Sequence, residues 1–291
     1  MERHDSAGRN KRQLIAEETL EILRSGHYSL VRGRPISIQP TLQQAIDGTI
    51  HYPVEAFPDL LQTRDTRLAT APRVKTTFNV ANVTTFAAAR QLLAEDPDSP
   101  VFCLNFASAK HPGGGFLKGA QAQEEALARA SGLYACLEPH HSFYERNLAS
   151  RTSLYTDAMI YSPSVPVFRD DRDQLIERPY AVSILTSPAV NAGAVRQNEP
   201  HREEYIAGVM RTRTEKLLTI AFIHGYRNLV LGAWGCGVFR NDPADVARLF
   251  HEFLTQGGIF AGTFHRVSFG VLDGTPGKST IAPFERLFRN A

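Results

Sequence analysis

Residues 101–137 join a strand, a glycine turn and a helix in direct succession, and they constrain the fold more than any other part of the chain. Val101 to Phe106 is a short apolar run, which is typical of a buried strand. His111 and Pro112 follow it, and then the glycine turn at 113–115. From about Gln121 apolar residues recur at helical spacing, namely Ala126, Leu127, Ala130, Leu133, Tyr134 and Leu137.

The glycine turn consists of Gly113, Gly114 and Gly115. Three glycines in succession lose much conformational entropy on folding, so such a turn indicates positive φ or a ligand lying directly against the main chain. Bare backbone amides ahead of a helix N-terminus favour an anion such as a pyrophosphate. The turn therefore predicts a ligand cradle.

Gln123, Glu124 and Glu125 occupy the first turns of the predicted helix. Acidic residues are common there because they complement the helix dipole, but these two follow a predicted ligand cradle. Adjacent residues on a helix point about 100° apart, so the two carboxylates cannot face each other across one bond as a glycosidase pair does. One carboxylate is expected to reach the chemistry while the other positions the sugar or holds the loop.

The three glycines, a gap of seven residues and Gln123-Glu124-Glu125 resemble the signature of the poly(ADP-ribose) glycohydrolases of the compact bacterial type. The preceding Asn105-Phe106-Ala107-Ser108 and Pro112 fit it as well, and the resemblance extends from the N-terminal helix to the strand containing Phe269. It implies a macrodomain-like three-layer α/β/α fold with a mixed central sheet and an N-terminal extension.

The overall composition is that of a soluble globular protein, with 43% hydrophobic and 21% charged residues among 291. A net charge of +2, with basic residues spread out, argues against a general nucleic-acid binder. No signal peptide and no apolar run of about 20 residues is present, so no membrane span is expected. The three cysteines lack metal-ligand spacing, and they predict reduced thiols in a cytoplasmic protein without structural zinc.

Helical and strand-like patterns alternate along the chain, which predicts an α/β layered fold with a largely buried mixed sheet. Residues 1–72 are predicted to be an extension, disordered over 1–9, helical over 10–26 and near 42–46, with strands at 29–31 and 36–38. Residues 73–291 are predicted to be the main domain. Its predicted strands are 76–80, 101–106, 158–161, 165–168, 181–185, 228–231 and 266–271, and its helices 84–93, 121–137, 140–148, 200–225, 243–255 and 281–288.

A second glycine loop leaves the strand at 228–231 and precedes a helix that Asn241 or Asp242 is expected to cap. Arg240 stands where a dinucleotide fingerprint needs its third glycine. Ligands of open α/β sheets bind beyond the carboxyl ends of strands, so two such loops are predicted to close on one diphosphate. The resemblance assigns Gly235, Cys236, Gly237 and Val238 to the diphosphate and Phe239 to a ribose.

Three further positions have both a structural and a functional interpretation. Phe269 reads as a core residue, and the resemblance implies a second role as a stacking face for adenine. Asn105 resembles a ribose-contacting position, although an asparagine at a strand end is often only a turn residue, and Asn191 is similar. Gly274 to Ser279 looks like a phosphate-binding loop, but Leu272 occupies its first glycine position, which favours a plain loop.

The resemblance implies that the substrate is poly(ADP-ribose), including the polymer on ADP-ribosylated proteins, and that the product is ADP-ribose. Glu125 is expected to protonate the ribose 2′-oxygen and then to act as base toward water, Glu124 to hold the ribose hydroxyls, and Gln123 to shape the loop. The glycine loops at Gly113–Gly115 and Gly235–Gly237 would hold the diphosphate. We expect no metal, no cofactor, no nucleic acid or membrane as partner, and a monomer.

Two alternatives come from other classes. A macrodomain that binds ADP-ribose without cutting it needs the glycine loops but not Glu125, so the intact Gln123-Glu124-Glu125 argues against it. A hydrolase of single ADP-ribosyl groups or of small ADP-ribose derivatives would share the pocket and stays open. A nucleotide-binding Rossmann enzyme is disfavoured by the missing fingerprint. Cleavage inside the polymer as opposed to its end, and removal of the unit next to the protein, also stay open.

Overall fold

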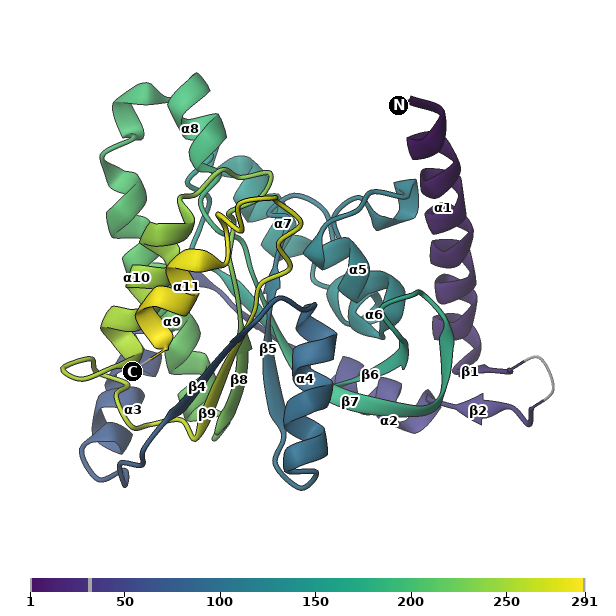
Figure 1. Ribbon diagram of the computed structural model, residues 1–291, viewed down its shortest axis with the longest axis horizontal. Coiled ribbons are helices and arrows are strands. Elements are labelled where there is room, and N and C mark those ends of the chain that lie inside the picture. The colour runs from purple at the N-terminus through teal and green to yellow at the C-terminus, as the bar shows by residue number, and fades with distance from the viewer. Residues whose placement is uncertain (1, 31–32, 290) are drawn as a thin grey trace.

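A seven-stranded mixed sheet forms the centre of the molecule, and helices cover both of its faces (Figure 1). The computed structural model describes residues 2–30, 33–289 and 291, with the side chains described from residue 7 onward. The strand order is β3-β6-β7-β5-β8-β9-β4. The strands are β3 (Ile50–Tyr52), β4 (Thr77–Ala81), β5 (Val101–Phe106), β6 (Met159–Arg169), β7 (Leu175–Ser187), β8 (Asn228–Leu231) and β9 (Arg266–Gly270).

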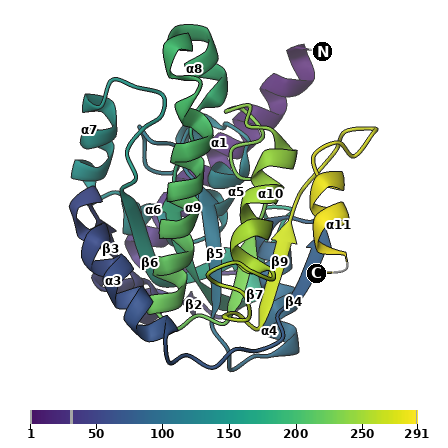
Figure 2. The same cartoon turned by 90° about the vertical axis from the view of Figure 1, so that its left-hand side faces the viewer.

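The helices divide into two layers because successive strand residues face opposite sides of the sheet. Phe102 and Leu104 of β5 face one layer, and Val101 and Cys103 face the other. The first layer holds α3 (Phe57–Leu68), α9 (Tyr205–Ile223), α10 (Pro243–Leu254) and α11 (Ala282–Phe288), which lie in front of the sheet in Figure 2. The second holds α2 (Gln39–Asp47), α4 (Thr85–Glu95), α5 (Gln123–Ala130), α6 (Leu133–Leu137) and α7 (His141–Ala149). The predicted three-layer α/β/α fold is confirmed.

Five strands of the sheet, β7, β5, β8, β9 and β4, are mutually parallel, whereas β6 runs antiparallel between β7 and β3. Parallel strands end at the same edge of a sheet. The loops after β5, β7, β8 and β9 therefore emerge together, toward the top of Figure 1. Both predicted glycine loops lie at this edge, as the rule for open α/β sheets expects.

The predicted extension is not separate from the sheet. Strand β3, which was not predicted, pairs with β6 at the sheet edge, and α3 places Phe57 and Leu68 in the core of the first layer. Arg64 of α3 donates a hydrogen bond to Glu215 of α9. The division into 1–72 and 73–291 stays a prediction, but the chain contributes sheet and core residues before position 72.

Helix α1 (Glu2–Ser25) begins earlier than the predicted residue 10. The prediction of disorder was wrong for residues 2–9, and residue 1 lies outside the described residues. The physical reason is tertiary, because Arg9 bonds to the carbonyl of Lys118. Strands β1 (His27–Tyr28) and β2 (Ile36–Ser37) form a small hairpin near the predicted strands, of which residue 31 is not described.

Three further elements differ from the predictions. The single helix expected over 121–137 is divided into α5 and α6, because Ser131 bridges to Val167 and the Gly132 amide bonds to the Pro166 carbonyl at 2.9 Å. The two strands expected around Pro163 are one strand, β6, with an irregular register there. A short helix, α8 (Ala192–Asn198), was not predicted, and the helix expected over 200–225 starts as a separate 3-10 turn.

Candidate active site

Gln123 joins the start of α5 to the end of β5. Its Oε1 accepts a hydrogen bond from the Phe106 amide at 2.9 Å. Its Nε2 donates to the Leu104 carbonyl at 2.8 Å and to the Thr85 hydroxyl at 3.0 Å. The predicted role in shaping the loop fits this geometry, since the whole amide group is bound to neighbouring elements.

Glu124 lies beneath the loop after β5, with 3% of its surface exposed. Its Oε2 accepts the Ser108 amide at 2.6 Å, and its Oε1 accepts the Asn105 Nδ2 at 3.2 Å. Burial raises the pKa of Glu124 to about 8, although the hydrogen bonds from Ser108 and Asn105 act in the opposite direction. Glu124 therefore keeps its proton at neutral pH.

Asn105 supports Glu124 from the end of β5. Its side chain is fully buried, and its Nδ2 also bonds to the Thr186 hydroxyl at 3.1 Å. Its Oδ1 has no hydrogen-bond partner among the described residues. The predicted contact of Asn105 with a ribose stays a prediction, and in this structure its buried amide bonds to Glu124 and Thr186.

Glu125 contacts the glycine turn directly, and its Oε1 accepts the Gly115 amide at 2.9 Å. A Cβ atom at Gly114 would lie 2.5 Å from the Glu125 Oε1 and 3.0 Å from the Glu124 Oε2. Gly114 also has a φ of +61°. Both the lack of space for a Cβ atom and the positive φ therefore require glycine at this position. Oxygen atoms of both carboxylates therefore reach the same glycine of the turn.

The amides of the glycine turn are not bare. The Gly115 amide bonds to Glu125, and the Gly114 amide bonds to the His111 carbonyl at 3.1 Å. The expectation of bare amides is therefore wrong for Gly114 and Gly115 in this structure. Glu125 and a backbone carbonyl occupy these two donors instead.

The loop after β8, residues 232–242, has the donors that the first loop lacks. Within the described part of the chain, no hydrogen-bond acceptor meets the amides of Gly235, Gly237, Val238 and Phe239. Asn241 holds the base of this loop by donating to the carbonyls of Val190 (2.7 Å) and Gly235 (3.1 Å). Successive unpartnered amides attract an anion, so the geometry suits the predicted diphosphate contact.

Two aromatic rings stand beside that loop. Phe239 lies 6.0 Å from the ring of Tyr155, centroid to centroid, and Tyr155 has a positive φ of 58°. Buried Arg213 holds the Tyr155 segment by donating to the Leu154 carbonyl at 2.9 Å. Sequence reasoning missed Tyr155 because no local pattern connects this loop residue to a position 84 residues away. Asn191, assigned a weak site role, accepts the Ala194 amide as the N-cap of α8.

The predicted adenine-stacking role of Phe269 is not supported by the structure. Phe269 is 0% exposed, and its ring centroid lies 4.4 Å from that of Phe288 and 5.4 Å from that of Phe284. The alternative interpretation, a core phenylalanine, describes its place. The apolar side chain that β9 leaves exposed beyond its end is Leu272.

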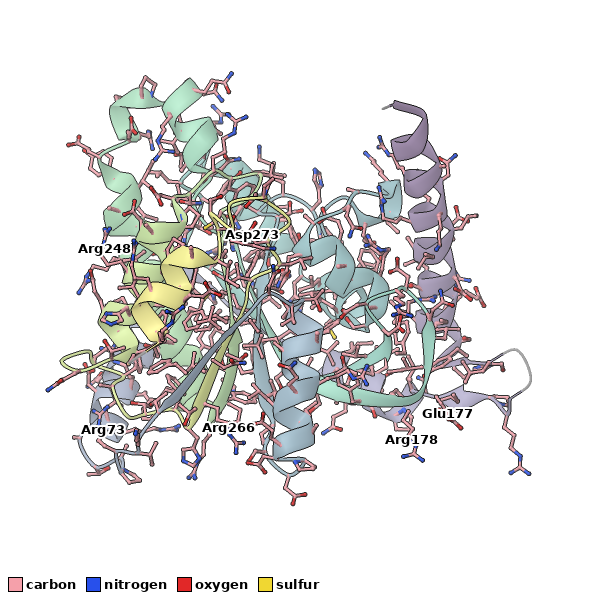
Figure 3. The ribbon with its side chains drawn as sticks, viewed as in Figure 1. Arg73, Glu177, Arg178, Arg248, Arg266 and Asp273 are labelled. Carbon is pink, nitrogen blue, oxygen red and sulfur yellow. The ribbon has the colours of Figure 1, made fainter. Side chains whose placement is uncertain are left out.

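The loop after β9 is organised by Asp273, which Figure 3 labels near the same edge of the sheet. Its Oδ1 accepts the hydroxyl of Thr275 at 2.7 Å and its Oδ2 accepts the amide of Thr280 at 2.8 Å. The hydrogen bonds from Thr275 and the backbone lower the pKa of Asp273 to about 2. The segment that looks like a phosphate-binding loop is thus wrapped around an aspartate, as the plain-loop interpretation expects.

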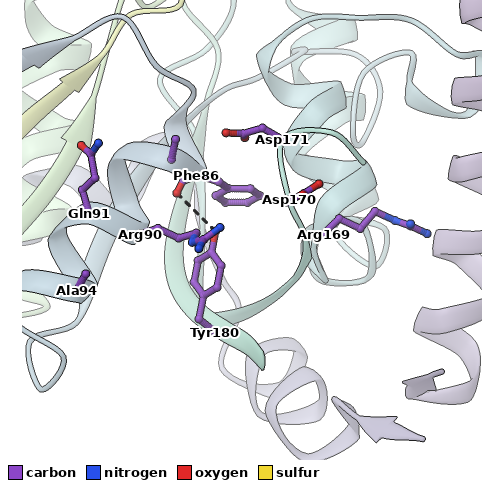
Figure 4. Close-up of a pocket in the computed structure, with 9 residues that line it drawn as sticks. Phe86, Arg90, Gln91, Ala94, Arg169, Asp170, Asp171 and Tyr180 are labelled. Carbon is purple, nitrogen blue, oxygen red and sulfur yellow. Dashed lines mark hydrogen bonds between the residues drawn. The ribbon is translucent and has the colours of Figure 1, made fainter. Parts of the chain in front are cut away.

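A separate pocket of about 320 Å³ lies between α4 and the hairpin of β6 and β7, lined by Phe86, Arg90, Asp171 and Tyr180 among others (Figure 4). None of the predicted site residues lines it. Among the described residues, no cluster of three or more His, Cys, Asp or Glu side chains has metal-binding geometry. The helices described include none long and apolar enough to span a membrane.

The chain is similar to known proteins of one family. A family model described as "Microbial-type PARG, catalytic domain" matches residues 16–170. The poly(ADP-ribose) glycohydrolase (PARG) of Thermomonospora curvata is 49% identical and has a TM-score of 0.90, over 96% of this chain and 100% of that one. Its complex with the inhibitor ADP-HPD is similar, at 49% identity and a TM-score of 0.87 over 95% and 99% of the two chains.

A second organism provides a relative with a ligand. The poly(ADP-ribose) glycohydrolase of Deinococcus radiodurans in complex with ADP-ribose is 47% identical, with a TM-score of 0.79 over 85% of this chain and 96% of that one. No curated protein sequence matched the chain.

Proposed function

Since this chain belongs to the microbial-type poly(ADP-ribose) glycohydrolase family, we propose that it cleaves the ribose–ribose O-glycosidic bonds of poly(ADP-ribose) and releases ADP-ribose. One observation supports catalysis in addition to binding. Glu124 and Glu125 converge on Gly114 at the carboxyl edge of the sheet, beside a loop in which four amides have no acceptor among the described residues. A protein that only binds ADP-ribose has no need of the second carboxylate.

Glu125 acts as the general acid and then as the base. It protonates the 2′-oxygen of the leaving ribose while the bond to the anomeric carbon breaks, and the bonding electrons pass to that oxygen. Water then attacks the oxocarbenium-like carbon and gives its proton to the Glu125 carboxylate. Both glutamates belong to one site, but only Glu125 is partly exposed there.

Glu124 positions the sugar. Burial keeps its carboxyl protonated at neutral pH, so it can donate a hydrogen bond to a ribose hydroxyl as well as accept one. Asn105 and the Ser108 amide fix its orientation. The amides of Gly235, Gly237, Val238 and Phe239 bind the diphosphate, and Tyr155 lies beside the ribose that contacts Phe239.

The test follows release of ADP-ribose from poly(ADP-ribose)-modified protein without added metal, for the wild type and for Glu125→Gln. Gln keeps the shape of the side chain but cannot transfer a proton. We expect a loss of at least about 10³-fold in the variant, in the range that general acid–base groups contribute, with ADP-ribose binding retained in calorimetry. Normal turnover by Glu125→Gln contradicts the assignment, and complete removal of single ADP-ribose units supports the mono-ADP-ribosyl hydrolase instead.

We also propose that the protein is a cytoplasmic monomer that does not bind nucleic acid and that reverses ADP-ribosylation after DNA damage. The nearly balanced net charge of +2 supports the absence of nucleic-acid binding. Three free cysteines, two of them buried, support a reducing compartment. Size-exclusion chromatography tests the monomer, and survival of cells lacking the protein after DNA damage tests the biological role.

A further inference from the structure

Three arginines bind three consecutive carbonyls in the segment that links the glycine turn to α5. Arg9 Nε donates to the Lys118 carbonyl at 2.8 Å, and Arg12 Nε donates to the Gly119 carbonyl at 2.7 Å. Arg129 Nη1 donates to the Ala120 carbonyl at 3.0 Å. We call Arg9, Arg12 and Arg129 the arginine clamp. Hydrogen bonds from a charged donor are about twice as strong as neutral ones.

The clamp comes from two helices that enclose the segment. Arg9 and Arg12 lie on α1, which runs along the outer side of α5 in Figure 1, and Arg129 lies on α5 itself. The helices are joined by the Thr19 hydroxyl, which donates to the Arg129 carbonyl at 2.7 Å. The second guanidinium nitrogen of Arg129 donates to Gln121 Oε1 at 2.6 Å. The clamp therefore holds the segment from both sides.

Backbone contact between α1 and the segment is close. Gly119 has a φ of +70°, and a Cβ atom there would lie 2.3 Å from the carbonyl oxygen of Arg9. Phe116, which starts the segment, is fully buried against Ala16 of α1 and Ala128 of α5. The helix is thus seated on the segment by main-chain contact and by packing, and the arginines add directional bonds.

A chain of peptide groups leads from the clamp to Glu125. The amides of Lys118 and Ala120 both donate to the Gly115 carbonyl, at 3.0 Å and 3.1 Å. The Gly115 amide donates to Glu125 Oε1 at 2.9 Å. The Gly119 carbonyl that Arg12 binds and the Ala120 amide belong to one peptide group, and the carbonyl and amide of Gly115 flank one α-carbon. The clamp therefore constrains the position of the amide that bonds to the acid.

We propose that Arg9 and Arg12 of helix α1, with Arg129, are positioning residues for Glu125, because they fix the peptide chain that ends at the Gly115 amide. The N-terminal helix then serves the rate of bond cleavage more than the binding of ADP-ribose, to which the loop after β8 contributes independently. This inference rests on the proposed glycohydrolase function.

The test compares Arg9→Met/Arg12→Met with Arg24→Met in the full chain. Methionine keeps the length of the side chain and removes its donors. Arg24 lies at the other end of α1, where it is exposed and, among the described residues, pairs with Glu21 alone, so its variant controls for lost charge on the same helix. Both variants are assayed for kcat and KM with the polymer and for ADP-ribose affinity by calorimetry.

We expect kcat of the double variant to fall about tenfold to 100-fold, the cost of a small misplacement of a catalytic group, while its Kd for ADP-ribose changes by less than about threefold. Arg24→Met should match the wild type. Arg12→Lys keeps a cationic donor at this position. If Arg12 acts by hydrogen bonding, this variant should keep a larger part of the wild-type kcat than a methionine at the same position does.

Other outcomes overturn the inference. An unchanged kcat in the double variant excludes a positioning role, and a loss of ADP-ribose affinity equal to the loss of kcat assigns the clamp to ligand binding. If the double variant binds no ADP-ribose, Arg9→Met alone, at an exposed position, repeats the test with a smaller change. If the wild type releases no ADP-ribose, the proposed glycohydrolase function is wrong. If the wild type is active and the double variant keeps its kcat, only the proposal for the clamp is wrong.

Discussion

The two glycine loops at the carboxyl edge of the sheet look alike in sequence and differ in what their amides do. In the turn of Gly113, Gly114 and Gly115, the amides of Gly115 and Gly114 bond to Glu125 and to a backbone carbonyl. In the loop after β8, four amides have no acceptor in the described part of the chain, and Val238 is 81% exposed.

The difference separates two tasks that a glycine-rich loop can perform. The first loop uses glycine so that carboxylates can approach the main chain, and the amides of Gly114 and Gly115 are bonded within the protein. The second loop uses glycine to present amides, and four of these have no acceptor among the described residues, which suits an anion. Preorganised groups serve the transition state, whereas available donors serve binding. Substitutions in the first loop should therefore act on kcat, and those in the second on KM.

The largest effect is expected from Gly114→Ala measured against Gly237→Ala. At Gly114 the added methyl group would lie 2.5 Å from Glu125 Oε1 and the φ is +61°, whereas nothing lies within 4 Å of the same atom at Gly237. We expect kcat to fall about 100-fold or more for Gly114→Ala and to stay near the wild-type value for Gly237→Ala. Equal losses in steady-state assays of the two variants would erase the distinction between the loops.

The second prediction concerns the stability that Glu124 contributes. Its folded pKa, raised by burial to about 8, lies above its ordinary value of 4.5, so the native state holds a proton that the unfolded chain releases. The free energy of unfolding therefore falls as pH rises from about 4.5 to about 8. Glu124→Gln lacks this loss, and we expect it to gain about 3.5 kcal/mol relative to the wild type between pH 5 and pH 8.

Urea unfolding of both proteins at pH 5, 6.5 and 8 measures this difference. Asp273→Asn is the matched control, since the pKa of Asp273 is lowered to about 2 and its contribution changes only in acid. A constant difference between Glu124→Gln and the wild type across this range would show that the buried carboxyl is ionised in the folded protein.

The third prediction sharpens the assignment of the second loop to binding. Phe239→Ala removes a half-buried ring that lies beside Tyr155. Aromatic contacts of this kind contribute about 1 kcal/mol beyond buried area, so we expect KM for the polymer to rise roughly tenfold with kcat reduced less. A fall in kcat at unchanged KM would show that Phe239 serves catalysis and not binding.

The smallest effect is expected at Phe269, which belongs to neither loop. Phe269→Leu replaces one core side chain with a smaller one and should lower the free energy of unfolding by about 1 kcal/mol. Calorimetry should find an unchanged Kd for ADP-ribose. A clear loss of affinity at unchanged stability would restore the adenine-stacking role that the sequence resemblance implied.

Strands were predicted correctly where the hydrophobic pattern of the sequence matches the burial of the residues in the fold. The strands at 101–106 and 228–231 were located to the residue, because each is an apolar run buried on both faces. Strand β3 has only three residues, partly exposed at the sheet edge, and leaves almost no pattern. The first turns of α1 look polar and disordered in sequence, yet they fold because Arg9 meets a turn more than a hundred residues away.

The site was predicted in outline for the same reason. Gln123-Glu124-Glu125 and the glycines lie within one short segment, so their proximity follows from the local fold. The arginine clamp has no such signal, since an arginine that binds a distant carbonyl looks in the sequence like any other arginine. Phe269 shows the opposite case. Val267, Phe269 and Val271 alternate with small residues, and this pattern alone favours the core position that the structure has.

The contact between Gly119 and the carbonyl of Arg9 also limits which substitutions the chain can accept during evolution. A side chain at position 119 fits only if α1 moves away, and a displaced α1 releases the carbonyls that it holds. Two regions that are about 110 residues apart are therefore expected to vary together among relatives. A chimera that joins the N-terminal helix of one family member to the turn of another is therefore expected to lose activity, even where both parent proteins are fully active.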